Sequence, residues 1–187
     1  MAAPEVEQGV HYRKIDSDLS AEKTKEILSA LKEPGILDAL KREPIRLISI
    51  GRFGDKQHPG WYDRNTKSIS VDSARKLGVQ FGEEFQPGRS WNMSRATTDK
   101  AESMRRSLLQ ETAHHIESSI PGVKQVIAEA WGNPSRRPIT GYAGYEPGEY
   151  FAESFVAYMA ERDALAKYDA IGSKMVEQAI VLMRKPK

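Results

Sequence analysis

Cysteine is absent from this sequence of 187 residues, which excludes disulfide bonds and thiolate metal sites. An excess of one charge is also missing, because 28 Lys and Arg stand against 26 Asp and Glu. Electrostatics therefore gives no reason to expect nucleic acid as a partner. No apolar run approaches the roughly 20 residues that span a bilayer, and residues 1–8 have neither the basic nor the apolar region of a signal peptide. We expect no membrane partner and no export by a signal peptide.

The remaining sequence has the order helices, strands and helices, which predicts an α+β fold with a small antiparallel sheet. Residues 1–19 are polar and aperiodic and are interpreted as an arm outside a domain of residues 20–187. Ser20 is a candidate N-cap for the first helix, and Asp63-Arg64-Asn65 is a candidate hairpin turn. The expected helices are 20–31, 36–42, 98–120, 123–131, 148–162 and 164–184; the expected strands are 45–50 and a hairpin within 60–72.

One short motif carries chemistry. Gln110-Glu111-Thr112-Ala113-His114 differs by one residue from His-Glu-x-x-His, in which two histidines on one helix face bind zinc and the glutamate is the general base. Taken alone, the motif is also compatible with a solvated helix face.

A downstream segment, residues 141–158, adds to this motif. Tyr142 precedes a turn, and Glu149 and Glu153 follow four residues apart, which places them on the same face of a helix. They alternate with Phe151 and Phe155, an apolar setting in which an ionised carboxylate needs a partner. The segment therefore predicts two carboxylates with a specific role, although surface charges have the same spacing.

Together the two blocks resemble the zincin metallopeptidases of the anthrax lethal factor and Pro-Pro endopeptidase group. That pattern is H-E-x-x-H, then a tyrosine, then E-F-F-A-E-x-F, and the resemblance covers roughly residues 100–185. It implies a zincin-like fold whose helices carry the site. The roles it implies are zinc ligands at Gln110, His114 and Glu149, the general base at Glu111, an oxyanion donor at Tyr142, and a carboxylate orienting a ligand histidine at Glu153. Tyr142 and Glu153 are also compatible with packing roles.

The chain departs from the family at the first ligand. The amide oxygen of Gln110 is a weakly basic donor, whereas zinc prefers imidazole, carboxylate or thiolate. His115 is rotated by about 100° from His114 on a helix, so we expect it to point away from the site. His11 and His58 lie in polar segments and are candidates for a replacement ligand. We therefore expect zinc to be bound weakly or not at all.

Three hypotheses about function follow. The first is a degenerate zincin that serves as a binding or structural module for a peptide or protein partner. It includes a place in a larger assembly, because zincin-like domains of this type also resemble domains attached to phage virion proteins. The second is an active zinc endopeptidase with an unusual first ligand. The third, an inactivated variant of a working protease, is less favoured because Glu111 is intact. The compartment stays open between cytoplasm and virion.

Overall fold

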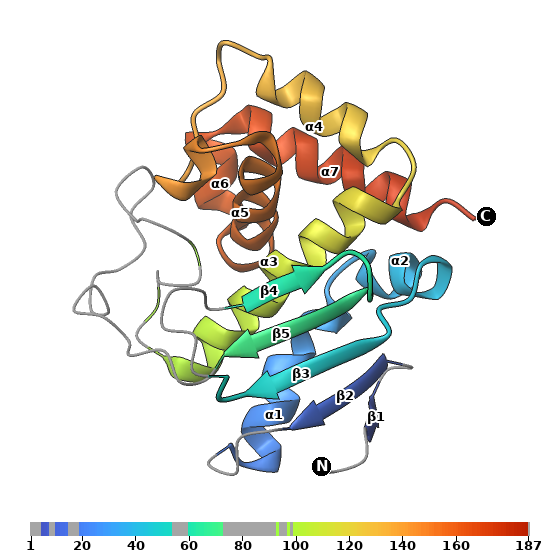
Figure 1. Ribbon diagram of the computed structural model, residues 1–187. Helices are drawn as coiled ribbons and strands as arrows, with labels where there is room; N and C mark the ends of the chain where they lie inside the picture. Colours follow the sequence, from blue (N-terminus) through green and yellow to red (C-terminus); the bar gives the residue numbers. More distant parts are fainter. Residues whose placement is uncertain are drawn as a thin grey trace.

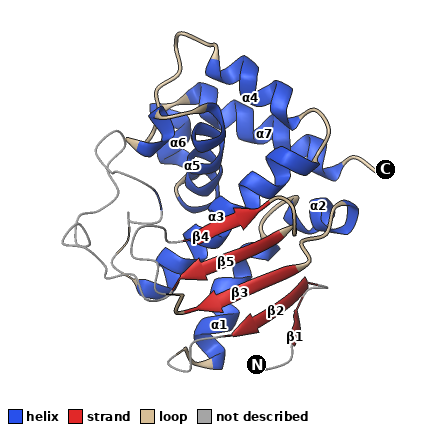
Figure 2. Ribbon diagram, viewed as in Figure 1, coloured by secondary structure: helices blue, strands red, loops and turns tan. Residues whose placement is uncertain are grey.

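The computed structural model describes residues 5–7, 10–14, 19–53, 60–72, 93, 97 and 99–186. These residues form an α+β fold in which one sheet is followed by a helical half (Figure 1). Within the described residues the strands lie between Glu5 and Asp72, and Figure 2 shows helices on one side of the sheet. None of the helices among these residues combines the length and the apolar composition needed to cross a membrane.

The strands make one mixed sheet in the order β1-β2-β3-β5-β4. The outer pairs β1–β2 and β4–β5 are antiparallel, whereas β2–β3 and β3–β5 are parallel. The predicted antiparallel sheet is therefore wrong at its centre. The helices between β2 and β3 return the chain to the end where β2 begins, and such a crossover produces a parallel pair. The strand bounds are Glu5–Glu7, Val10–Lys14, Leu47–Gly51, Gly60–Asp63 and Ser68–Asp72 for β1 to β5.

The first strands correct the interpretation of residues 1–19 as an arm. β2 pairs along β3, with Tyr12 opposite Ile48. Val10 and Tyr12 are buried, whereas His11 between them is exposed. This alternation is that of a half-buried strand, so the described part of the segment belongs to the sheet.

The hairpin of β4 and β5 confirms the prediction for residues 60–72. Its turn is closed by the Asp63 carboxylate, which accepts the backbone N–H groups of Asn65 and Thr66, an Asx-type turn. β4 is the last strand of the sheet. Tyr62, Ile69, Ile48 and Tyr12 lie opposite one another in a row across the sheet.

The helices follow the predicted positions with one exception. The side chain of Ser20 accepts the N–H of Lys23 as the predicted N-cap of α1. The segment expected as one helix over 164–184 is two helices, because the chain breaks at Asp169. The helix bounds are Ala21–Leu28, Ile36–Arg42, Lys100–Ser119, Val123–Trp131, Pro147–Ala160, Arg162–Tyr168 and Ala170–Arg184 for α1 to α7, with 3₁₀ turns η1 at Ser29–Lys32 and η3 at Tyr142–Gly144.

Helix α3 is the central element that positions the site. It packs against β4 and β5 on one side and against α5 on another. The sheet meets the helices with fully buried side chains such as Ile50 and Val71, and α5 contributes Phe151 and Phe155, whose ring centroids are 5.7 Å apart. Both contacts bury apolar surface, the main favourable term in folding. They place one face of α3 between the edge strand β4 and the start of α5, and this face carries the candidate site described below.

Candidate functional site: an acidic cleft beside the sheet edge

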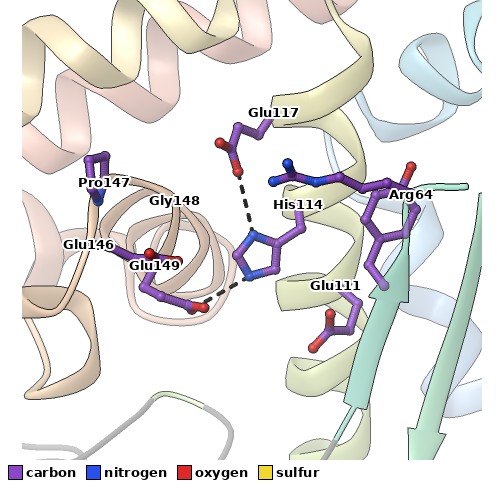
Figure 3. A pocket seen from close by; sticks show the side chains of 9 residues that line it. Arg64, Glu111, His114, Glu117, Glu146, Pro147, Gly148 and Glu149 are labelled. Atoms are coloured by element: carbon purple, nitrogen blue, oxygen red, sulfur yellow. Dashed lines mark ion pairs between the residues drawn. The ribbon is translucent and has the colours of Figure 1, made fainter.

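A cleft of about 410 Å³ lies where α3, the start of α5 and the end of β4 meet. Figure 3 shows that α3 presents Glu111, His114 and Glu117 to it, while Glu149 reaches across from α5. Residues spaced three apart on a helix share one face, which is why α3 can supply all three. The lining residues are Tyr62, Arg64, Glu111, His114, Glu117, Glu146, Pro147, Gly148 and Glu149.

His114 lies between two carboxylates. Its Nδ1 is 3.6 Å from Glu117 Oε2, and its Nε2 is 3.5 Å from Glu149 Oε2. Burial alone would lower the pKa of His114, but hydrogen bonds to these two carboxylates and the charge of Glu111 raise it to about 10. At neutral pH the metal-free ring is therefore an imidazolium, with a proton on each nitrogen, and a metal would have to displace one of these protons to bind there.

Gln110, at the predicted first-ligand position, lies one helical turn before His114. Its side chain is buried, and its Nε2 donates a hydrogen bond of 3.3 Å to Glu149 Oε2. Its Oε1 is buried without a hydrogen-bond partner among the described residues. The amide therefore faces Glu149 with its donor side.

Glu111 lies against the sheet edge. A Cβ on Gly60 would be 3.1 Å from Glu111 Cγ, so the missing side chain at Gly60 allows this close approach of strand and helix. The carboxylate accepts the backbone N–H of Tyr62, and burial, the largest cause, raises its pKa to about 7. A carboxyl group of this kind can exchange a proton near neutral pH.

Tyr142, the predicted oxyanion donor, lies in η3. Burial, followed by the charge of Glu149 and a hydrogen bond to it, raises the pKa of its hydroxyl above the ordinary value. The hydroxyl is therefore a donor to Glu149 at all ordinary pH values. The structure thus brings three predicted site residues, Gln110, His114 and Tyr142, together around the Glu149 carboxylate.

Glu153 has partners that the sequence did not indicate. Its Oε2 accepts the Met93 N–H at 2.7 Å and the Thr140 hydroxyl at 2.8 Å, and Thr140 Oγ1 accepts the Ala143 N–H. Burial raises the pKa of Glu153 to about 8. Among the described residues, the hydrogen bonds of Glu153 run to Met93 and to Thr140, which precedes Tyr142, and not to a histidine. Glu153 therefore stabilises the loop that carries Tyr142.

Neither of the other two described histidines, His115 and His11, faces the cleft. His115 is buried, with its Nδ1 2.9 Å from the Tyr62 hydroxyl and its Nε2 2.7 Å from the Glu43 carbonyl oxygen. The prediction that His115 points away from the site is confirmed. His11 is exposed on β2, which β3 and β5 separate from β4, so it is not a replacement ligand. His58 lies outside the described residues.

The side chains of the cleft can be compared with what a zinc ion requires of its ligands. Within the described ranges, no group of three or more His, Asp or Glu side chains is arranged to hold a metal. The reason is visible at two residues: His114 is protonated between carboxylates, and Gln110 turns its donor toward Glu149. The cleft therefore offers two good zinc ligands, His114 and Glu149, and His114 would have to release a proton before it could bind the metal.

Several residues of the cleft were missed by sequence reasoning. Glu117 could have been found, since it follows His114 by three residues on the same helix face. Tyr62, Arg64 and Glu146 come from the hairpin and from the residue before α5, and their position depends on the tertiary fold. The cleft as a whole combines carboxylates, one imidazolium and one guanidinium beside β4, the last strand of the sheet among the described residues. No model of a known protein family matches this chain, and no curated protein sequence matches it either.

Proposed function

We propose that the chain is a zincin-like domain that no longer binds zinc tightly and whose cleft binds an extended peptide segment of a protein partner. The carrying observation is the Gln110 side chain, which donates to Glu149 where a zincin would have a ligating histidine. The mixed sheet with an antiparallel last strand along the Glu111-His114 helix supports the zincin likeness. Glu149 on the later helix supports it as well.

Peptide binding is supported by the outer edge of β4, beside which the described part of the chain places no further strand. Its pairing to β5 uses one side of the strand, and the Tyr62 N–H is directed to Glu111 on the other side. Unpaired backbone donors and acceptors on a sheet edge can take another extended strand. The cleft lies beside this edge, so the side chains of such a segment would reach Glu111 and His114.

Zinc analysis tests the loss of the metal site. Purified protein should carry well under one zinc per chain by mass spectrometry of the metal. Gln110→His should raise the zinc affinity by at least about 100-fold in calorimetry, because a third good ligand joins His114 and Glu149. Adding His114→Ala to this variant should abolish the gain.

Two outcomes would contradict the proposal. Stoichiometric zinc held through His114 and Glu149 in the unchanged protein would overturn the loss of the metal site. A Gln110→His variant that still binds no zinc would overturn the roles carried over to Glu149 and Tyr142. A place in a phage virion or another assembly is tested separately: purification of the protein alone from its native source would count against it.

One observation favours the alternative, an active zinc endopeptidase with an unusual first ligand. Glu111 has its pKa raised to about 7 by burial, which suits a general base. Peptide hydrolysis in the presence of added zinc, lost in Glu111→Gln, would establish this alternative. Absence of hydrolysis in the unchanged protein, with hydrolysis in Gln110→His, would favour the degenerate module.

A further inference from the structure

Glu117 is a residue of the cleft to which the proposed function assigns no role. It lies on α3 three residues after His114, and its side chain is 14 % exposed. Its Oε2 is buried, and among the described residues its one close polar partner is His114 Nδ1, at 3.6 Å. A buried carboxylate needs a partner, and Glu117 has it in the ring nitrogen that faces away from Glu149.

The surroundings of Glu117 favour a carboxylate at this place. A Cβ on Gly148 would be 3.1 Å from Glu117 Oε2, so the missing side chain of the glycine leaves room for the oxygen. Gly148 is the second residue of α5, and the positive end of a helix dipole attracts a negative charge. Arg64 and Lys124 add favourable charge interactions with Glu117. The carboxylate is therefore held by more than its contact with His114.

The two nitrogens of the His114 ring have different neighbours. Nδ1 faces Glu117, and Nε2 is 3.5 Å from Glu149 Oε2 on α5 (Figure 3). A ligand histidine gives one nitrogen to the metal, and the hydrogen bond of the other nitrogen fixes the tautomer and the direction of the ring. With Glu117 at Nδ1, the nitrogen left for a metal is Nε2, which faces the second good ligand of the cleft.

Resting on the zincin likeness in the proposed function, we propose that Glu117 is a positioning residue for His114. It holds the ring through Nδ1 so that Nε2 faces Glu149, and Gly148 gives the carboxylate its room. Glu117 thus has the task that the sequence resemblance implied for Glu153, whose hydrogen bonds among the described residues do not reach a histidine. The site that lacks the first histidine ligand keeps the carboxylate that orients the second.

Zinc affinity of Gln110→His gives the first test, because we expect this variant to have three good ligands. Calorimetry compares it with the double variants that add Glu117→Leu, Glu117→Gln or Glu146→Leu. Glu117→Leu removes the acceptor beside His114 and should lower the zinc affinity at least about tenfold, whereas Glu117→Gln keeps an acceptor and should restore most of it. Glu146→Leu removes a carboxylate from the exposed rim of the same cleft and should lower it by no more than about twofold, since exposed charges are screened.

Gly148→Ala displaces the carboxylate without replacing it. The added Cβ would meet Glu117 Oε2 at 3.1 Å, so the zinc affinity of the Gln110→His variant should fall about threefold or more. Alanine is favoured over glycine in a helix, so thermal unfolding should show no loss of stability. A role of Glu117 in folding alone would instead leave the zinc affinity unchanged. This variant also serves if Glu117→Leu fails to fold.

A second readout requires no zinc. In the otherwise unchanged chain, treated with a chelator, the Nδ1 proton of His114 should give an NMR signal, because the contact with Glu117 slows its exchange with water. The signal should disappear in Glu117→Leu and persist in Glu117→Gln and Glu146→Leu. Loss of the signal in Glu117→Leu alone would assign the contact to this carboxylate.

The outcomes separate this inference from the proposed function. An unchanged Nδ1 signal in Glu117→Leu, or equal losses of zinc affinity on adding Glu117→Leu or Glu146→Leu, would overturn the role of Glu117 and leave the zincin likeness intact. A Gln110→His variant that binds no zinc would overturn the proposed metal site. The Nδ1 signal of the zinc-free chain then decides whether Glu117 holds the His114 ring.

Discussion

His114 and His115 are neighbours in the chain, yet they lie in opposite environments. His114 faces the cleft between Glu117 and Glu149 and carries a proton on each nitrogen. His115 is enclosed between the Tyr62 hydroxyl and the Glu43 carbonyl, where burial lowers its pKa. The difference arises from a rotation of about 100° per residue around the helix.

The comparison separates the two sides of α3. On the His115 side, neutral hydrogen bonds fix the helix to β4 and to the end of α2. On the His114 side, charges gather around the cleft. Tyr62 joins the two sides, because its hydroxyl contacts His115 and its backbone N–H contacts Glu111. The position of the strand edge in the cleft therefore depends on the buried, neutral side of the helix.

The largest expected difference between His114 and His115 is in the pKa values of their rings. In chelator-treated protein, His114 should stay protonated until the pH approaches 10, whereas His115 should stay neutral to below the ordinary value of 6.5. Histidine nitrogen chemical shifts measure both, with assignment from single histidine variants. Titration of both rings near 6.5 would remove the distinction.

The same shifts have opposite effects on stability. The raised pKa of His114 gives stability that is complete below pH 6.5 and is lost as the pH rises toward 10. The lowered pKa of His115 gives stability that is present above 6.5 and is lost as the pH falls below that value. In urea unfolding, the stability lost in His114→Ala should therefore shrink as the pH rises from 6.5 toward 10, whereas the stability lost in His115→Ala should shrink as the pH falls below 6.5.

Removal of His115 should have the next largest effect. His115→Ala deletes two buried hydrogen bonds and leaves a cavity, for which we expect a loss of about 3 kcal/mol in the free energy of unfolding. His11→Ala, on the exposed side of β2, is the matched control and should change it by less than about 0.5 kcal/mol. Equal losses in urea unfolding would show that the buried network does not hold α3 to the sheet.

Gly60→Ala should weaken the contact between β4 and α3, with a smaller loss of stability than His115→Ala. The added Cβ would lie 3.0 Å from the Ser70 carbonyl oxygen and 3.1 Å from Glu111 Cγ, so we expect a loss of about 1–2 kcal/mol. Gly144→Ala is the control, because its nearest atom there, Pro138 Cβ, is 3.9 Å away. Thermal unfolding measures both, and an unchanged Gly60→Ala would argue against a tight strand–helix contact.

Glu153→Gln should have the smallest effect, below about 1 kcal/mol at pH 7. The amide oxygen can accept the same Met93 and Thr140 donors, and the carboxyl group, with its pKa raised to about 8, is largely protonated at that pH. Since stability from a raised carboxyl pKa is lost as the pH rises toward 8, the variant should be the more stable protein at pH 9. A large loss at pH 7 in denaturant unfolding would instead require an ionised Glu153.

The sequence predicted features that local rules decide. The cap at Ser20, the hairpin turn at Asp63 and the direction of His115 follow from neighbouring residues or from helix geometry. β2 was missed because Val10 and Tyr12 are isolated apolar residues in a polar segment, and its parallel partner lies some 36 positions away in the chain. The bonds of Glu153 to Met93 and Thr140, and the place of Arg64 in the cleft, depend in the same way on tertiary contacts.

The pairing of β2 with β3 has a practical consequence for production of the protein. A shortened variant that starts near residue 20, which the polar composition of the first residues invites, would remove β2 and leave β3 as an edge strand. β3 carries Ile48 and Ile50, and a newly exposed apolar edge promotes association between chains. Such a variant should aggregate on expression, so affinity tags and fusion partners are better placed with the first strands retained.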